Sequence, residues 1–232
     1  PTVADLDGDG SLELIMGTSM GMLYVWDARN LYSRDGWPVQ FQRGIESRVL
    51  VEDVRDDTNL EMFVADVGGT VACLNHKGEK LWHRNLAESV AYGDQKAEVI
   101  GASPMVLGDV NGDGILDLVQ LLQIRMPHVG VGMLHLFAMS ADTGKFLKGF
   151  PKRIDKSEDQ PKSDNEEFVV QKLPAPLLVD LHSDQSWLES YIHRGGTSFT
   201  KPAPSHIRDK PPHGGPNIGL HIVFPVEKSI VI

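Results

Sequence analysis

Asp5-Leu-Asp-Gly-Asp-Gly-Ser-Leu-Glu13 and Asp109-Val-Asn-Gly-Asp-Gly-Ile-Leu-Asp117 are the two stretches that decide the fold of this chain. In each, a short apolar segment runs into an aspartate, glycines permit a tight turn, and a second apolar segment follows. Two other stretches, Asp53-Val-Arg-Asp-Asp-Thr-Asn-Leu-Glu61 and Asp180-Leu-His-Ser-Asp184, also follow apolar segments. We name these stretches, in chain order, loop one (5–13), loop two (53–61), loop three (109–117) and loop four (from 180).

The four loops belong to a repeat. Their first aspartates recur at intervals of about 50 to 70 residues, a period typical of propellers and solenoids. Each unit repeats one order, in which a strand, an acidic loop, a second strand, a glycine turn and a third strand follow one another without a helical period. The second and third strands are predicted over 12–18 and 21–26, 60–65 and 70–74, and 116–124 and 132–139.

A fourth, outer strand is predicted near Gly36-Trp-Pro38, over 79–83 and near Gly149-Phe-Pro151. Four antiparallel strands per unit are the composition of a propeller blade, so we predict an all-β fold, a partial β-propeller of about four blades. A stack of three-stranded solenoid turns is the alternative. The predicted units span about 1–47, 48–102, 103–174 and 175–232, with insertions at 154–167 and 183–217.

Composition and charge narrow the classes of function. The 232 residues are 41% hydrophobic and include 23 glycines and 14 prolines, which indicates a turn-rich globular protein. A net charge of −10 argues against a nucleic-acid partner and suits metal cations. No membrane span or signal peptide is evident, and because the chain begins with Pro1 rather than Met we expect a fragment of a longer chain. The single cysteine, Cys73, is predicted to be a buried thiol in a strand.

The acidic loops predict calcium sites. Oxygen-bearing side chains stand at positions 1, 3, 5 and 9 of loops one and three, and Ca²⁺ requires about six to eight oxygen ligands. Position 7 would contribute its backbone carbonyl, and an EF-hand is excluded because position 12 lacks a glutamate. Ordinary Asp-Gly turns, which need no metal, are the alternative. The predicted ligands of two Ca²⁺ ions are Asp5, Asp7, Asp9, Ser11 and Glu13, and Asp109, Asn111, Asp113, Ile115 and Asp117.

Loops two and four depart from this pattern. Loop two has Arg55 at position 3, which we expect to pair with the neighbouring carboxylates and to replace the ion. Realigning loop four with the strand that begins near 220 brings Leu220 to position 9. Both loops are therefore predicted to lack metal.

The acidic loop followed by an apolar strand and a glycine turn resembles the FG-GAP repeats of integrin α-subunit propellers, whose nine-residue loops bind Ca²⁺. More narrowly, residues 1–21 and 66–82 resemble the defective-in-exine-formation family of plants. This resemblance implies a secretory-pathway or plasma-membrane protein with a luminal propeller, anchored by a membrane span outside this fragment and active in pollen-wall assembly. It implies a binding or scaffold module with a protein or polysaccharide ligand on one propeller face.

The alternative interpretation is that the chain belongs to an enzyme. The sequence contains no nucleophile elbow, P-loop, dinucleotide fingerprint or paired-cysteine zinc motif. A calcium-dependent polysaccharide lyase or hydrolase remains open, because the sequence does not show which side chains converge in a central cleft. Trp26, Trp37 and Trp82 can stack on sugars, but we expect them to pack within and between blades.

Overall fold

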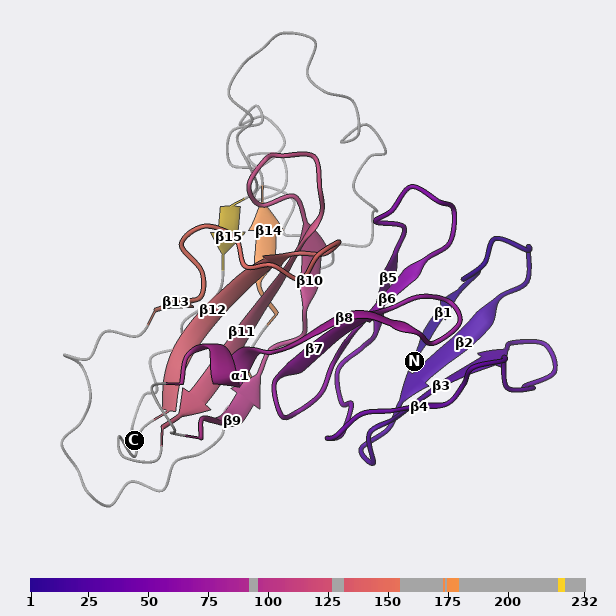
Figure 1. The fold of residues 1–232 in the computed structure, drawn as a ribbon, viewed down its shortest axis with the longest axis horizontal. Helices are drawn as coiled ribbons and strands as arrows, with labels where there is room; N and C mark the ends of the chain where they lie inside the picture. The colour runs from indigo at the N-terminus through magenta and orange to yellow at the C-terminus, as the bar shows by residue number, and fades with distance from the viewer. Residues whose placement is uncertain (92–95, 127–131, 155–172, 174, 180–220, 224–232) are drawn as a thin grey trace, which may run out of the picture.

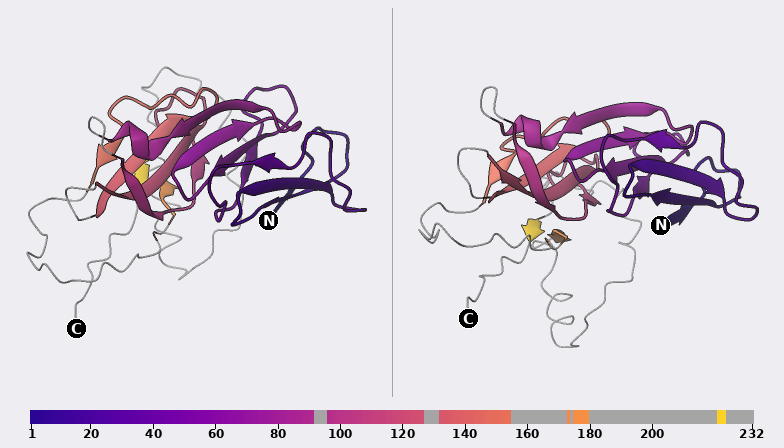
Figure 2. Two further views of the ribbon diagram at one scale, coloured as in Figure 1. Left: turned by 60° about the horizontal axis from the view of Figure 1, so that its bottom comes forward. Right: turned by 90° about the horizontal axis from the view of Figure 1, so that it is seen from below.

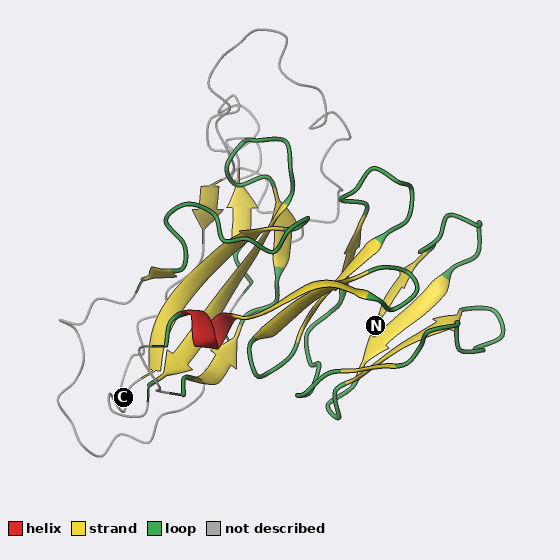
Figure 3. Ribbon diagram, viewed as in Figure 1, coloured by secondary structure: helices red, strands yellow, loops and turns green. Residues whose placement is uncertain are grey.

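The fold is built from antiparallel sheets that follow one another along the chain. The computed structural model describes residues 1–91, 96–126, 132–154, 173, 175–179 and 221–223. Figure 3 shows that this part of the chain is almost entirely strand and loop. Its one helix, α1 (Leu86–Ser89), is a single turn, and the described residues include no helix with the length and apolar character that a membrane crossing needs.

Three sheets contain most of the strands. Sheet one has the order β1-β2-β3-β4, sheet two β5-β6-β7-β8, and sheet three β10-β11-β12-β13 with β9 also paired to β11. Figure 1 shows the sheets side by side in chain order, and Figure 2 shows them from two other directions. The strands are β1 (Thr2–Ala4), β2 (Glu13–Gly17), β3 (Met22–Asp27), β4 (Val39–Gln40), β5 (Leu50–Glu52), β6 (Glu61–Ala65), β7 (Thr70–Leu74), β8 (Lys80–Asn85), β9 (Glu98–Ala102), β10 (Val106–Gly108), β11 (Asp117–Arg125), β12 (Gly132–Ser140) and β13 (Lys152–Arg153).

Sheet two is buried on both faces. Successive residues of a strand point to opposite faces, so β6 and β7 divide their side chains between two cores. One face, which includes Phe63 and Cys73, packs in a cluster with Leu122 and Phe137 of sheet three. The other face, which includes Met62 and Leu74, packs with residues of sheet one such as Ile15. Face-to-face packing of successive antiparallel sheets, each built on a path of four strands, is blade packing, so the chain has the all-β fold of a partial β-propeller.

The outer face of sheet three is covered by a third cluster, which joins Val119 and Leu136 to Leu173 and Leu178. Leu178 lies in β14 (Leu177–Val179), which pairs antiparallel with β15 (His221–Val223). The predicted insertions lie almost wholly outside the described residues, as does loop four.

The three tryptophans for which packing was predicted, Trp26, Trp37 and Trp82, pack within and between sheets. Trp37 donates its indole N–H to the carbonyl of His76 in the β7–β8 turn (3.1 Å), and Trp82 donates to the carbonyl of Ala141 after β12 (2.9 Å). Trp26 stacks on Tyr24 with ring centroids 4.9 Å apart. Cys73 is 1% exposed in β7, and burial raises the pKa of its thiol to about 12, so the predicted buried thiol is confirmed.

The outer strands and β9 differ from the sequence-based expectation. β4 and β13 begin directly after Pro38 and Pro151 rather than at the Gly-aromatic-Pro motifs themselves, since proline has no N–H to donate to a neighbouring strand. β9 was not predicted. It pairs with the far end of β11, where Arg125 lies opposite Glu98, and a register shift near Gln123 accommodates it.

The strand directions separate two ends of the sheets. Loops one, two and three join the first and second strands of their sheets at one end (Figure 1). Because the strands are antiparallel, the β2–β3 and β6–β7 turns and the start of β9 lie at the opposite end. We call these the loop end and the turn end.

Candidate metal centre

The three acidic loops share one backbone shape. Positions 4 and 6 have positive φ in each: Gly8 and Gly10 (70° and 83°), Asp56 and Thr58 (55° and 74°), and Gly112 and Gly114 (74° and 84°). Glycine takes this conformation without steric cost, whereas a β-branched residue such as Thr58 is strained in it. Loop two therefore curls in the same way as loops one and three without their glycines.

The first aspartate holds each curl through backbone N–H groups. In loop one, Asp9 and Gly10 donate to Oδ1 and Oδ2 of Asp5 at 3.1 and 2.9 Å. Asp53 of loop two and Asp109 of loop three accept the same pair of bonds. The position 5 aspartate accepts from position 7, so the N–H of Ser11 donates to Asp9 at 2.7 Å and that of Ile115 to Asp113 at 2.8 Å. These hydrogen bonds, all made between residues of the same loop, hold each loop in its curled shape.

The carboxylate at position 9 is buried at the start of the second strand in all three loops. Glu13 and Asp117 are 0% exposed and Glu61 is 2% exposed. One oxygen of each accepts from the position 2 N–H, at 2.9 Å in loops one and three and at 3.2 Å in loop two. Burial raises the pKa of all three, and that of Asp117 reaches about 6.

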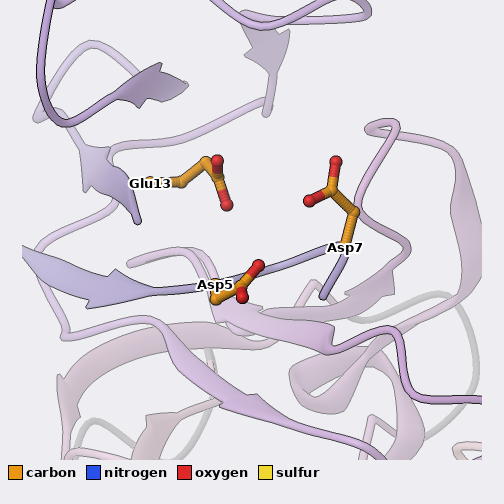
Figure 4. Close-up of side chains that lie close together, drawn as sticks. All are labelled: Asp5, Asp7 and Glu13. Carbon is orange, nitrogen blue, oxygen red and sulfur yellow. The ribbon is translucent and has the colours of Figure 1, made fainter. Parts of the chain in front are cut away.

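Loop one gathers three carboxylates around one point. Oxygen atoms of Asp5, Asp7 and Glu13 lie within 4.8 Å of one another, and Figure 4 shows these side chains converging. Buried Oδ1 of Asp7 and Oε1 of Glu13 have no hydrogen-bond partner. Asp9 remains at the exposed edge, where the N–H of Ser11 lowers its pKa. The structure therefore brings together three of the four predicted side-chain ligands.

A cation of the protein itself, Arg34, lies against this group. Its guanidinium pairs with Asp7, and its Nη1 lies 3.4 Å from Oε1 of Glu13 and 3.8 Å from Oδ2 of Asp9. Arg34 lies in the β3–β4 connection. Its role was not predicted from the sequence, because it lies outside the acidic stretch of loop one. It partly supplies the positive charge that the buried carboxylates need.

Beside loop three, no described residue provides such a cation. Leu147 occupies the position in sheet three that Arg34 occupies in sheet one. The N–H of Arg34 donates to the carbonyl of Val25 in β3, and the N–H of Leu147 donates to the carbonyl of Ala138 in β12, both at 3.0 Å. Leu147 packs in the apolar cluster on sheet three. A comparison of the segments that precede Gly36-Trp-Pro38 and Gly149-Phe-Pro151 would have revealed this exchange.

The predicted ligands of loop three are less closely gathered. Asn111 donates its amide to Asp113 at 2.8 Å and accepts from the N–H of the same residue at 2.9 Å. Asp117 keeps a buried Oδ1 without a hydrogen-bond partner. Its pKa is raised first by burial and further by the charges of Asp113 and Asp109. Within the described ranges, only loop one brings three carboxylates within 4.8 Å.

Loop two differs from its prediction at Arg55. We expected Arg55 to pair within its own loop, but its Nε lies 3.9 Å from Oδ1 of Asp142, beyond β12 in sheet three. Both side chains are about two-fifths exposed, so this pair contributes little to stability. Arg55 therefore bridges two sheets, while its charge also acts on Glu61 of its own loop against the burial that raises the pKa of that carboxyl.

The donor sets of loops one and three fit a hard divalent cation. Each offers carboxylates in a loop with a strand on either side, and each contains buried oxygens that lack hydrogen-bond donors: Asp7 Oδ1, Glu13 Oε1 and Asp117 Oδ1. Such oxygens are costly to bury without a partner, and bound Ca²⁺ would give them one. The bound ion would supply charge neutralisation and crosslinking of the loop rather than a reaction.

Comparison with known proteins finds similar solved structures but no matching family model or curated sequence. Quinohemoprotein alcohol dehydrogenase from Comamonas testosteroni is similar over 62% of this chain and 20% of its own, at 16% identity and a TM-score of 0.39. BamB from Moraxella catarrhalis is similar over 61% of this chain and 34% of its own, at 18% identity and a TM-score of 0.37. The chain thus spans between a fifth and about a third of these structures, and its membership of the FG-GAP or plant family stays a prediction.

Proposed function

We propose that the chain is a calcium-binding propeller module that acts by presenting a contact surface rather than by catalysis. The observation that carries the metal assignment is the set of buried carboxylate oxygens without hydrogen-bond donors in loops one and three. An orphaned charged oxygen destabilises a fold unless a cation compensates it. Two loops with the same backbone, each with a buried carboxylate oxygen that lacks a hydrogen-bond donor, support one ligand for both.

The two proposed sites differ in affinity. In loop one, Ca²⁺ must displace Arg34 from Asp7 and Glu13. In loop three, no guanidinium of a described residue competes with it, since Leu147 occupies the place that matches Arg34. We therefore propose that loop three fills first and loop one at higher calcium concentration, while loop two remains metal-free.

Bound Ca²⁺ would hold the position 9 carboxylate against the rest of its loop, and so fix the connection between the first two strands of a blade. Rigid blades suit a surface that binds a protein or polysaccharide partner. A secretory or cell-surface setting, with a role in wall assembly, is the accompanying proposal from the sequence resemblance. The enzymatic alternative, a polysaccharide lyase, stays a prediction that an assay for sugar release would test.

Thermal unfolding of the Asp113→Asn variant tests the metal assignment. Asparagine preserves an oxygen that can accept from Ile115 but removes the charge and the oxygen that accepts from Asn111, so we expect the melting temperature to fall by about 3–6 °C more in calcium than in chelator. Asp35→Asn is the matched control, because exposed Asp35 carries the same charge outside the loops. An equal fall in calcium and in chelator would contradict the metal assignment.

A further inference from the structure

A polar cleft of about 680 Å³ lies at the turn end of the sheets, away from the acidic loops. Its walls come from three places: the segment between β4 and β5, the β6–β7 turn, and β9 with the end of β11. A volume of this size is typical of ligand sites. The residues that line it are Gln42, Arg43, Val67, Gly68, Thr70, Asn85, Lys96, Ala97, Glu98, Val99 and Arg125.

The walls of the cleft are fixed to one another. The N–H of Val67 donates to the carbonyl of Gly44 at 2.8 Å, which joins the β4–β5 segment to the β6–β7 turn. The turn contacts β9 closely, since a Cβ at Gly69 would lie 2.9 Å from a methyl group of Val99. A Cβ at Gly68 would lie 2.8 Å from Cγ of Arg43, so the stem of that arginine lies against the glycine. The cleft is therefore preformed rather than dependent on closure.

The charge of the cleft is opposite to that of the chain. Among the described residues that line it, Arg43, Lys96 and Arg125 stand against one carboxylate, Glu98, in a protein of net charge −10. Among the described residues, no ion pair joins Arg43 or Lys96 to a carboxylate. Glu98 accepts from Nε and Nη2 of Arg125 at 3.2 and 2.6 Å, in a pair whose side chains are 62% and 42% exposed. An exposed pair of this kind is weak, so a ligand carboxylate can compete for Arg125.

We propose that this cleft binds an acidic peptide segment of a partner protein. Guanidinium and ammonium groups recognise carboxylates, and the amide of Gln42 and the hydroxyl of Thr70 can bond to peptide groups. Among the residues that the structure describes, the lining contains small apolar side chains, Val67 and Val99, and no aromatic ring of the kind that stacks on sugars. The cleft therefore favours a peptide over an acidic polysaccharide. This inference specifies the partner of the proposed interaction function and does not depend on calcium, because the acidic loops lie at the other end.

Binding of a fluorescein-labelled hexaglutamate peptide, followed by anisotropy in chelator and again in calcium, tests the inference. We expect Arg43→Gln combined with Lys96→Gln to weaken binding about tenfold or more, because two cations are lost from a preformed site. Glu98→Gln should strengthen binding about threefold, since it removes the one opposing charge and frees Arg125. Lys77→Gln is the matched control, because exposed Lys77 lies in the β7–β8 turn at the loop end.

Unfolding temperatures of these surface variants should match that of the wild type, which separates loss of binding from loss of fold. The inference is overturned if hexaglutamate binds no better than hexaglutamine, or if the Lys77 variant loses as much affinity as the cleft variant. Tighter binding of an oligogalacturonate than of hexaglutamate would overturn the peptide assignment. Peptide binding without calcium binding would support the proposed peptide site and contradict the proposed metal sites, so the failure of one proposal can be distinguished from the failure of the other.

Discussion

Loop one and loop three have the same backbone but balance their buried charge differently. Loop one surrounds Glu13 with other carboxylates and sets Arg34 against them. Loop three buries Asp117 without an ion pair to any cation in the described part of the chain, and the pKa of that carboxyl rises to about 6. The difference teaches that one loop architecture can be stabilised by a side chain or can require an external ion. Which of the two applies is decided in the β3–β4 or β12–β13 connection, outside the loop itself.

The largest effect is expected from Arg34→Leu, which gives loop one the residue that stands beside loop three. Without metal, the loss of Arg34 leaves Glu13 uncompensated and should lower the free energy of unfolding by about 2–3 kcal/mol. With metal, the loss of a competing cation should raise calcium affinity at loop one about tenfold or more. Urea unfolding in chelator and calorimetry in calcium measure the two effects, whose signs are opposite.

Arg29→Leu is the control for this exchange. Arg29 acts on Asp9 only through its charge, and no ion pair joins it to the loop among the described residues. It should therefore change calcium affinity by less than about threefold. If the Arg29 and Arg34 variants change calcium affinity equally, Arg34 is not the residue that distinguishes loop one from loop three.

The second effect concerns pH and Asp117. Its folded pKa of about 6 exceeds the ordinary value of 3.8, so the folded state binds the proton more tightly. In the metal-free protein this group therefore stabilises the fold most below about pH 4, and that contribution is lost as pH rises through about 6. Asp117→Asn should remove this pH dependence and, without metal, raise stability at pH 7 by about 1–3 kcal/mol.

The matching variant in loop one should gain less stability. Arg34 offsets part of the burial cost that raises the pKa of Glu13, so we expect Glu13→Gln to raise stability at pH 7 by less than Asp117→Asn does. Urea unfolding of both variants between pH 4 and pH 8 in chelator gives the comparison. Equal gains in the two variants would show that Arg34 does not distinguish the two loops.

The smallest effect is expected in loop two, where the shared backbone shape is held without glycine. Thr58 has φ 74°, which strains its β-branched side chain, so Thr58→Gly should raise the free energy of unfolding by about 0.5–1 kcal/mol. Exposed Thr143, which has no positive φ, provides the control, and glycine there should lower stability by a similar amount. An equal loss at both positions would contradict a common strained geometry.

Much of the fold could be predicted because it follows from local patterns. The apolar runs between acidic loops and glycine turns predicted β2, β3, β6, β7, β11 and β12 to within about two residues. Prediction was weaker for β4 and β13, which have two residues each beside a proline. β9 was not predicted, because its pairing with β11 is a long-range contact that no local pattern specifies.

The site was predictable only in part, for the same reason. The loop sequences predicted the curl, and the buried position 9 carboxylates lie where the spacing placed them. Arg34 stands 21 residues beyond Glu13, and only the folding of β3 against β2 brings the two together. Arg55 was assigned to its own loop because it lies within that sequence, but its length lets it reach Asp142 in the next sheet. Pairing across strands and sheets decided both cases.

Calorimetric titration of Ca²⁺ into the chelator-treated protein tests the central claim most directly. The account predicts two ions bound in unequal steps, the tighter lost in Asp113→Asn and the weaker strengthened in Arg34→Leu. No saturable heat in the wild type or in the Arg34 variant would contradict it, and would reduce the acidic loops to turns held by their own hydrogen bonds.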